Sequence, residues 1–288
     1  MSEHDNPLIL TFRCPKELDG LIPPPVPAAQ GLPGWLKAMP STAFSALIAG
    51  EDNTVKRCPP FVDAMTCGFL IPLVCDVKIA NGELTWDNEL PPGGAVDFLR
   101  SPIGVHDPGQ VTGTPLFDAE RFLIKFHNLW TIEAPEGYSL LFTHPVNRFD
   151  LPFTTLTGLV ECDTYHDAWI HFPARWNEPN FNGVLPKGTP IAQCFPIKRD
   201  NWTARTAAFT KEETQRAHDL TSAITREKGV YRAGISRRRL VAERDAHAGR
   251  RRAPEWPVRQ AVGRHVLRHA MSLPPHRVCP FPAGICPD

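Results

Sequence analysis

The chain has 288 residues, of which 42% are hydrophobic, 22% are charged and 31 are proline, and its formal net charge is zero. This composition is typical of a globular protein, but proline is at about twice its usual share of about 5%, which argues against long helices. The zero net charge hides an asymmetry. Residues 1–232 carry 20 basic and 27 acidic side chains, whereas residues 233–288 carry 11 arginines and four acidic residues. The acidic body argues against nucleic-acid binding except through the basic tail, because a phosphate backbone requires a basic surface.

The sequence shows no sign of a membrane or export segment. No apolar run reaches the about 18 residues of a membrane-spanning helix, and the first five residues include the acidic Glu3 and Asp5 where a signal peptide would be basic. We therefore expect a cytoplasmic protein that makes no contact with membranes. Its eight cysteines form no C-x-x-C pair, so we expect reduced thiols, several of them buried, and no zinc site.

The N-terminal part begins with a proline-punctuated arm at residues 14–40. The run from Ile22 to Pro27 fits polyproline geometry, and a short amphipathic piece follows around Trp35 and Leu36. We expect the arm to lie against the core or against a neighbouring subunit. The alternative is a ligand for a proline-recognition domain.

A hairpin follows the arm. The run 69–79 leads into Asn81-Gly82, and residues 83–86 return; Asn-Gly favours the positive φ angles of a two-residue hairpin turn. Residues 87–118 are rich in Gly, Pro and Asp, which predicts a surface loop or a lid over a site.

Short strands are predicted over the central part of the chain. Many short strands at close spacing favour a sandwich or barrel of mainly β class. The runs are Phe122–Phe126, Leu129–Glu133, Tyr138–Thr143, Thr157–Cys162, Ala168–Phe172 and Pro190–Pro196.

One helix is predicted at residues 211–228. Thr210 and Glu213 form a capping box, Ala217, Leu220 and Ile224 share one face, and Gly229 suits the end of the helix. We expect this helix to pack onto the sheet. Residues 1–232 are thus predicted to form a single β-rich domain, with the Pro-rich arm at 14–40 and the β core at about 60–205.

Residues 233–288 differ in composition from the rest of the chain. They contain no Lys, Asn or Tyr, and the periodicity of the preceding residues is lost. We interpret them as a disordered tail or the product of a shifted reading frame. The functional alternative is a basic arm for nucleic acid or anionic surfaces.

Three elements between Pro135 and Pro196 resemble the dUTPase and dCTP-deaminase superfamily. They are the P-x-G-Y turn at 135–138, the run Gly158–Tyr165 and the run Lys187–Gln193, which matches K-G-x-x-I-A-Q. The resemblance implies a β-clip fold for the core, between the Pro-rich arm and the C-terminal helix that the residues predict, and a homo-oligomer with sites between subunits. Over residues 7–232 the chain also resembles a family of bacterial and phage proteins, a domain of unknown function.

The resemblance also implies a site for a small anionic metabolite such as a nucleotide. It would assign the attacking water or the sugar to Glu161, stacking near the sugar to Tyr165, and phosphate contact to Gln193. From the residues themselves, Glu161 and Asp163 alternate around Cys162, so both carboxylates can project from one face of a strand. Their like charges can raise the pKa of one of them to make a general base, or the two can together hold Mg²⁺. Arg148 is the candidate anion contact. The alternative is a solvated strand end with ordinary carboxylates.

Two other functions are left open. His127, His144, Asp150 and His171 could hold Fe in a non-haem oxygenase, since two histidines and a carboxylate bind Fe(II) with open positions. The other is a non-catalytic structural or assembly protein, consistent with the Pro-rich arm. Cys162 and Cys194 are either nucleophiles or buried structural thiols. Lys56-Arg57 and Lys198-Arg199 are either anion contacts or separate surface charges.

Overall fold

A computed structural model describes residues 8–86, 101–116, 123–226, 230, 231 and 234. The chain divides into two units, Met1–Ala208 and Phe209–Asp288. Every strand that the structure describes lies in the first unit, and helix α3 lies in the second. Residues 87–100 of the predicted lid and residues 235–288 of the predicted tail lie outside the described residues.

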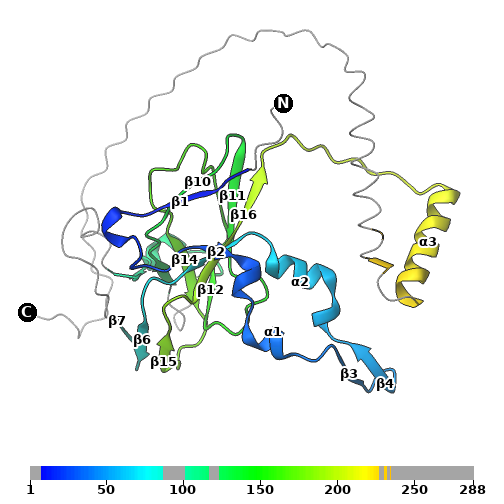
Figure 1. Ribbon diagram of the computed structural model, residues 1–288, viewed down its shortest axis with the longest axis horizontal. Helices are drawn as coiled ribbons and strands as arrows, with labels where there is room; N and C mark the ends of the chain where they lie inside the picture. Colours follow the sequence, from blue (N-terminus) through cyan, green and yellow to red (C-terminus); the bar gives the residue numbers. More distant parts are fainter. Residues whose placement is uncertain (1–7, 87–100, 117–122, 227–229, 232–233, 235–288) are drawn as a thin grey trace, which may run out of the picture. The chain divides into compact units, whose positions relative to one another are not determined.

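Two larger antiparallel sheets form the body of the first unit (Figure 1). Their buried side chains share one hydrophobic core, which includes Ile71, Phe126, Phe142, Phe153 and Trp176. The five-stranded sheet has the order β13 (Gly158–Val160), β11 (Tyr138–Thr143), β16 (Pro190–Lys198), β5 (Phe69–Pro72) and β2 (Val26–Pro27). The four-stranded sheet has the order β12 (Phe153–Thr155), β14 (Phe172–Trp176), β9 (Leu123–Phe126) and β8 (Ile103–Val105).

Three smaller antiparallel sheets complete the described strands. They are β15 (Gly183–Leu185), β6 (Val77–Ala80) and β7 (Glu83–Trp86); β1 (Thr11–Arg13) with β10 (Thr131–Glu133); and β3 (Thr42–Ser45) with β4 (Gly50–Asn53). The predicted hairpin turn between β6 and β7 is confirmed, because Asn81 and Gly82 have φ angles of 52° and 81°. The predicted run 69–79 divides into β5 and β6, which belong to different sheets.

The helices confirm two predictions and add one. The predicted piece around Trp35 and Leu36 is α1 (Gly34–Ala38), and the predicted C-terminal helix is α3 (Lys211–Arg226). The added helix is α2 (Pro59–Thr66), which begins with two prolines, as the first turn of a helix allows. Short 3₁₀ turns lie at Lys16–Leu18, Ala28–Gly31, Val55–Arg57 and Pro108–Val111.

The capping box of α3 is present. The Glu213 N–H donates to Thr210 Oγ1 over 3.2 Å, and the Thr210 N–H donates to Glu213 Oε2 over 2.8 Å. The packing of this helix onto the sheet stays a prediction, as does the single domain over residues 1–232.

One predicted strand is misplaced. The sequence predicts a strand over Ala168–Phe172, but β14 begins only at Phe172 and runs to Trp176. Trp169 packs instead against a second, smaller core cluster that includes Leu18, Leu129 and Trp130.

The predicted mainly β class is confirmed by the five described sheets, while the β-clip arrangement stays a prediction. Among the described residues, no helix is long and apolar enough to cross a membrane.

Candidate functional site

The turn between β11 and β12, residues 144–150, is held in place by Gln193 of β16. Gln193 is 1% exposed, and its Oε1 accepts a hydrogen bond from the N–H of Val146 over 2.9 Å. Its Nε2 donates to the carbonyl oxygens of Cys67, over 2.6 Å, and Ala64, over 3.2 Å. The amide of Gln193 thus links the β11–β12 turn to the end of α2, and both of its polar atoms are engaged in internal hydrogen bonds.

The same turn contains the predicted anion contact, Arg148. Its Nε and a terminal nitrogen donate to the two carboxylate oxygens of Asp150 over 2.8 and 2.9 Å. The indole N–H of Trp35 also donates to Asp150, over 3.2 Å. Burial raises the pKa of Asp150, but the hydrogen bonds and positive charge of Arg148 outweigh it, so the pKa is lowered overall. Arg148 is therefore already neutralised by an internal carboxylate in a two-point contact.

His144 is also engaged within this turn. Its Nε2 donates to the carbonyl oxygen of Arg148 over 2.9 Å, and its Nδ1 accepts from the N–H of Thr155 over 3.3 Å. Burial lowers the pKa of His144, which favours the neutral imidazole that this pair of hydrogen bonds requires. In this state His144 has no ring nitrogen available for a metal ion.

A second group of polar side chains lies at the opposite end of β11. Asp163 accepts hydrogen bonds from both terminal nitrogens of Arg199 and from the N–H of Gly137. One terminal nitrogen of Arg199 also donates to the Tyr138 carbonyl over 3.1 Å. The hydrogen bonds from Arg199 lower the pKa of Asp163 to about 2, so Asp163 is a carboxylate at neutral pH and is paired with Arg199.

Glu161 and Tyr165 lie on the turn that contains Asp163. The Tyr165 N–H donates to the Glu161 carbonyl oxygen over 2.8 Å, which closes the turn. Glu161 is exposed and Tyr165 is 51% exposed. Both side chains are therefore accessible to solvent.

The predicted substrate site is divided between the two ends of β11. In the register of β11 with β16, Thr143 is opposite Gln193 and Tyr138 is opposite Lys198, the residue before Arg199. A strand rises about 3.4 Å per residue, so the five steps between these positions separate the two groups by about 17 Å. Arg148, His144, Asp150 and Gln193 belong to one group, and Glu161, Asp163 and Tyr165 belong to the other.

The two remaining predicted metal ligands, His127 and His171, lie side by side. Their ring centres are 4.8 Å apart, and His127 Nδ1 lies 2.6 Å from the Ser101 carbonyl oxygen. Burial lowers the pKa of both, to about 4 for His171. Among the described residues, no group of three or more His, Cys, Asp or Glu is placed to hold a metal ion. The four residues named for the oxygenase therefore do not form one cluster.

The two cysteines considered as nucleophiles are both in the core. Cys162 and Cys194 are 0% exposed, and burial raises their pKa values to about 11 and about 12. A thiolate is the nucleophilic form of cysteine, so neither side chain is activated. Both fit the alternative of buried structural thiols.

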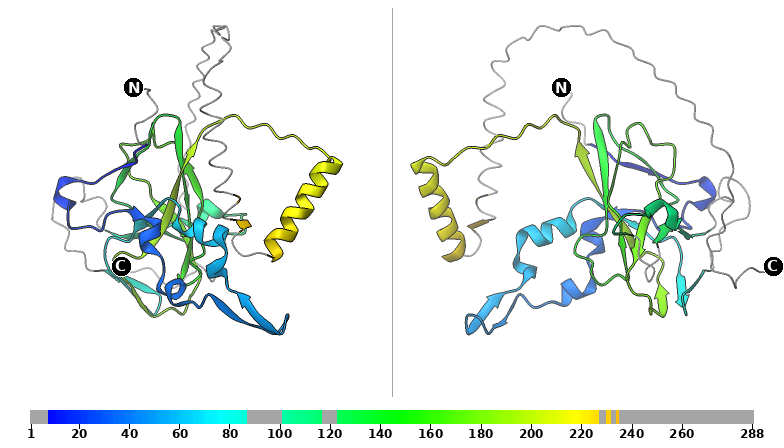
Figure 2. Two further views of the ribbon diagram at one scale, coloured as in Figure 1. Left: turned by 45° about the vertical axis from the view of Figure 1, so that its right-hand side comes forward. Right: turned by 180° about the vertical axis from the view of Figure 1, so that it is seen from behind.

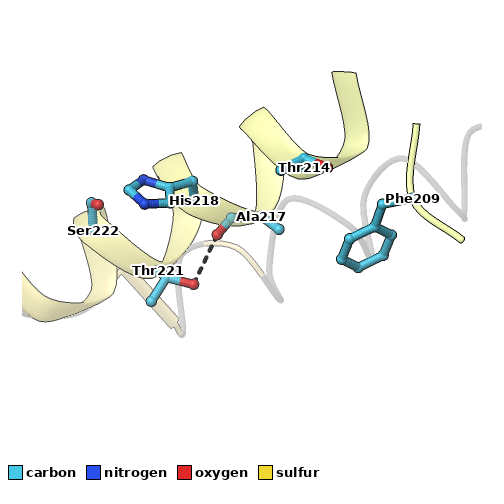
Figure 3. A pocket seen from close by; sticks show the side chains of 6 residues that line it. All are labelled: Phe209, Thr214, Ala217, His218, Thr221 and Ser222. Carbon is cyan, nitrogen blue, oxygen red and sulfur yellow. Dashed lines mark hydrogen bonds between the residues drawn. The ribbon is translucent and has the colours of Figure 1, made fainter. Parts of the chain in front are cut away.

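A pocket of about 310 Å³ lies along one side of α3 (Figure 3). His218 is the one histidine of its lining, and the lining has no carboxylate or guanidinium group. Thr221 Oγ1 donates to the Ala217 carbonyl within the helix over 2.8 Å. The pocket lacks the paired polar groups that acid–base or anion chemistry requires. The remaining lining residues are Phe209, Thr214 and Ser222.

The hairpin formed by β3 and β4, residues 42–53, here called the hairpin arm, is not among the elements predicted from the sequence. Its tip has Ala49 at a φ of 50° followed by Gly50. An Ala-Gly pair is a weaker turn signal than Asn-Gly, because alanine lacks the side chain that eases positive φ. The apolar residues Phe44, Leu47 and Ile48 of the arm are all exposed.

Comparison with known proteins adds little to this picture. No protein-family model and no curated protein sequence matches the chain. Among solved structures, it is similar to a mutant dUTPase from phage phi11 of S. aureus, a structure that details the coordination of a structural Mg(II) ion. The identity is 12%, and the match covers 38% of this chain and 79% of the phage enzyme, with a TM-score of 0.25. A TM-score this low carries no argument about fold or function. The chain is a mainly β protein of small antiparallel sheets.

Proposed function

We propose that this chain is a non-catalytic assembly protein whose hairpin arm packs against a second copy of the same chain. The observation that carries the proposal is the exposure of the arm: Leu47 is 94% exposed, Phe44 is 70% exposed and Ile48 is 58% exposed. Exposed apolar side chains that lie together on a protein surface are a mark of interaction sites.

The arm has no cover within the described part of the chain. β3 and β4 pair with each other and with no other described strand, and most of their residues are exposed. Figure 1 and both views of Figure 2 show the arm extending beyond α1 and α2, away from the two larger sheets. A two-stranded hairpin alone is marginally stable in water, so a surface that covers the arm would also stabilise it.

The base of the arm is tied to the body, which gives the arm a defined direction. Lys56 Nζ donates to the carbonyl oxygens of Lys37 and Met39, both over 2.8 Å, and the Thr54 N–H donates to the Ser41 carbonyl over 3.1 Å. A presented arm loses less conformational entropy on binding than a free loop. These contacts also engage Lys56, which the sequence analysis considered as an anion contact.

The non-catalytic part of the proposal is supported by the internal bonding of the predicted site residues. Gln193 and Arg148 are engaged at one end of β11, and Asp163 is engaged at the other. A second copy is favoured as the partner because most soluble oligomers are homo-oligomers. The Pro-rich residues 14–40, which precede the arm, are typical of segments that lie against a neighbouring subunit.

The test is the oligomeric state of the full chain, measured by size-exclusion chromatography with light scattering over a range of concentrations. We expect an oligomer that Leu47→Asp weakens by at least about tenfold, since burying a leucine contributes about 1.5–3 kcal/mol. The matched control is Val105→Asp, because Val105 of β8 is also apolar and 72% exposed. A monomeric wild type, or an oligomer unchanged by Leu47→Asp, would refute the proposal.

The nucleotide hypothesis is tested separately by thermal shift. The full chain is heated with nucleotides, with and without Mg²⁺, and a bound ligand raises the melting temperature by mass action. Two results together would replace the assembly proposal with a nucleotide site. The first is a rise in melting temperature with nucleotide that is lost in Glu161→Gln, and the second is an oligomeric state that Leu47→Asp leaves unchanged. The assembly proposal expects that no nucleotide raises the melting temperature.

A further inference from the structure

Two histidines face each other across adjacent strands of the four-stranded sheet. Phe126 of β9 pairs with Phe172 of β14, so the flanking His127 and His171 are also opposite each other, with ring centres 4.8 Å apart. Both phenylalanines belong to the main core. Because side chains alternate along a strand, the two histidines lie on the opposite face of the sheet, away from that core.

The ring of His127 is oriented with one nitrogen left open. Its Nδ1 lies 2.6 Å from the carbonyl oxygen of Ser101, and a carbonyl can only accept, so Nδ1 carries the proton. Nε2 then has a free lone pair. Histidines that bind metals usually donate their other ring N–H to a backbone carbonyl or a carboxylate in this way.

A glycine, Gly104 of β8, lies next to His127 Nε2. A Cβ atom at Gly104 of β8 would lie 3.0 Å from His127 Nε2, so any larger residue would crowd this nitrogen. On the other ring, His171 Nδ1 is buried and has no hydrogen-bond partner among the described residues. A buried polar atom without a partner costs free energy, which a ligand at that atom would recover.

We propose that His127 and His171 form a two-histidine site for a divalent transition metal ion such as zinc, copper or nickel. Imidazole nitrogen is a preferred ligand of these ions. Two imidazoles on one tetrahedral ion, each nitrogen about 2.0–2.1 Å away, place their ring centres about 5 Å apart. The site has two ligands from the described residues, and the remaining positions go to water or to a small anion.

Lys125 sets the charge of the site. It lies two residues before His127 on β9, and its positive charge acts on both histidines. A nearby ammonium opposes a metal dication and attracts an anion. An anionic ligand on the open metal positions, such as hydroxide or chloride, therefore fits better than water alone, and removal of the Lys125 charge strengthens metal binding.

The experiment is a titration of the metal-free full chain with Zn²⁺ by calorimetry, in a Cys58→Ser, Cys67→Ser background that removes two exposed thiols. Co²⁺ absorption gives a second readout of the ligand set. We expect His127→Ala and His171→Ala each to weaken Zn²⁺ binding by at least about tenfold. The matched control, His218→Ala, removes an exposed histidine of α3 and leaves the affinity unchanged.

Two variants keep both histidines and so test the geometry itself. Gly104→Ala places a methyl group against His127 Nε2 and should weaken binding, whereas Lys125→Gln should strengthen it several-fold. The melting temperature without metal reports whether each variant is folded. If a histidine variant is not folded, the Zn²⁺ affinities of Gly104→Ala and Lys125→Gln test the proposal in its place. The proposal is overturned if Zn²⁺ does not bind, or if it binds equally to the double variant lacking both histidines.

Discussion

Asp163 and Arg199 form a two-point ion pair that joins the β13–β14 connection to the residue after β16. One carboxylate oxygen accepts from Arg199 over 2.9 Å, and the other accepts from the second terminal nitrogen and from the Gly137 N–H. This pair fastens the end of the five-stranded sheet at which β11 begins. In the structure, this carboxylate connects Gly137 and Arg199, while its predicted catalytic role stays a prediction.

The first prediction concerns acid stability. The pKa of Asp163 is about 2 in the folded protein, against an ordinary value of 3.8. A lowered pKa contributes stability above the ordinary value, which is lost as pH falls from about 4 towards 2. We expect Asp163→Asn to be less stable than wild type at pH 7 and to lose less stability across that window, measured by urea denaturation. Asp200→Asn, which removes an exposed partner of Lys198, is the control and should behave as wild type.

The second prediction separates a structural from a ligand-binding role for Gln193. Gln193→Ala removes the side-chain partner of the Val146 N–H and of two carbonyl oxygens in a partly buried place. We expect the free energy of unfolding to fall by about 2–4 kcal/mol. Gln215→Ala, which removes an exposed amide of α3 that bonds to Asp219, should cost less than about 0.5 kcal/mol. Unchanged stability in Gln193→Ala would favour the phosphate contact that the resemblance implies.

The third prediction concerns Gly68, which has a φ of 72° just before β5. A Cβ at this position would lie 2.1 Å from the Cys194 carbonyl oxygen, so Gly68→Ala adds a backbone clash to the strain of positive φ. Gly20 has a φ of 75° and open space around its Cα, so Gly20→Ala measures the strain alone, about 1–2 kcal/mol. We expect Gly68→Ala to cost a further about 1–3 kcal/mol in urea denaturation. Equal costs at the two positions would contradict the close approach to Cys194.

The fourth prediction concerns thiol reactivity. Burial raises the pKa of Cys162 to about 11 and that of Cys194 to about 12, whereas Cys58 and Cys67 are exposed. After alkylation with iodoacetamide at pH 8, mass spectrometry should find label on Cys58 and Cys67, with Cys162 and Cys194 labelled only in urea. Rapid labelling of Cys162 in the folded protein would support the hypothesis that it is a nucleophile.

Local sequence patterns foretold several elements correctly. The Asn81-Gly82 turn and the Thr210–Glu213 capping box are confirmed, and the predicted strand Tyr138–Thr143 has the bounds of β11. Each signal depends on residues that are neighbours in the chain: positive φ, a free N–H at a helix start, or alternation along a strand. The misplaced strand at 168–172 shows the limit, because an apolar run does not state which sheet or cluster it joins.

The mainly β class, the main turns and the capped helix can be predicted from the amino-acid sequence, because they follow from backbone preferences over a few residues. The roles of the polar side chains depend on how distant segments pair in the fold. The pairing of β11 with β16 places Gln193 at one end of β11 and Lys198, the residue before Arg199, at the other. The pairing of β9 with β14 brings His127 to His171. The partners of these side chains are remote in the chain, as Arg199 is from Asp163, so hydrogen bonding and burial set their roles and sequence spacing does not.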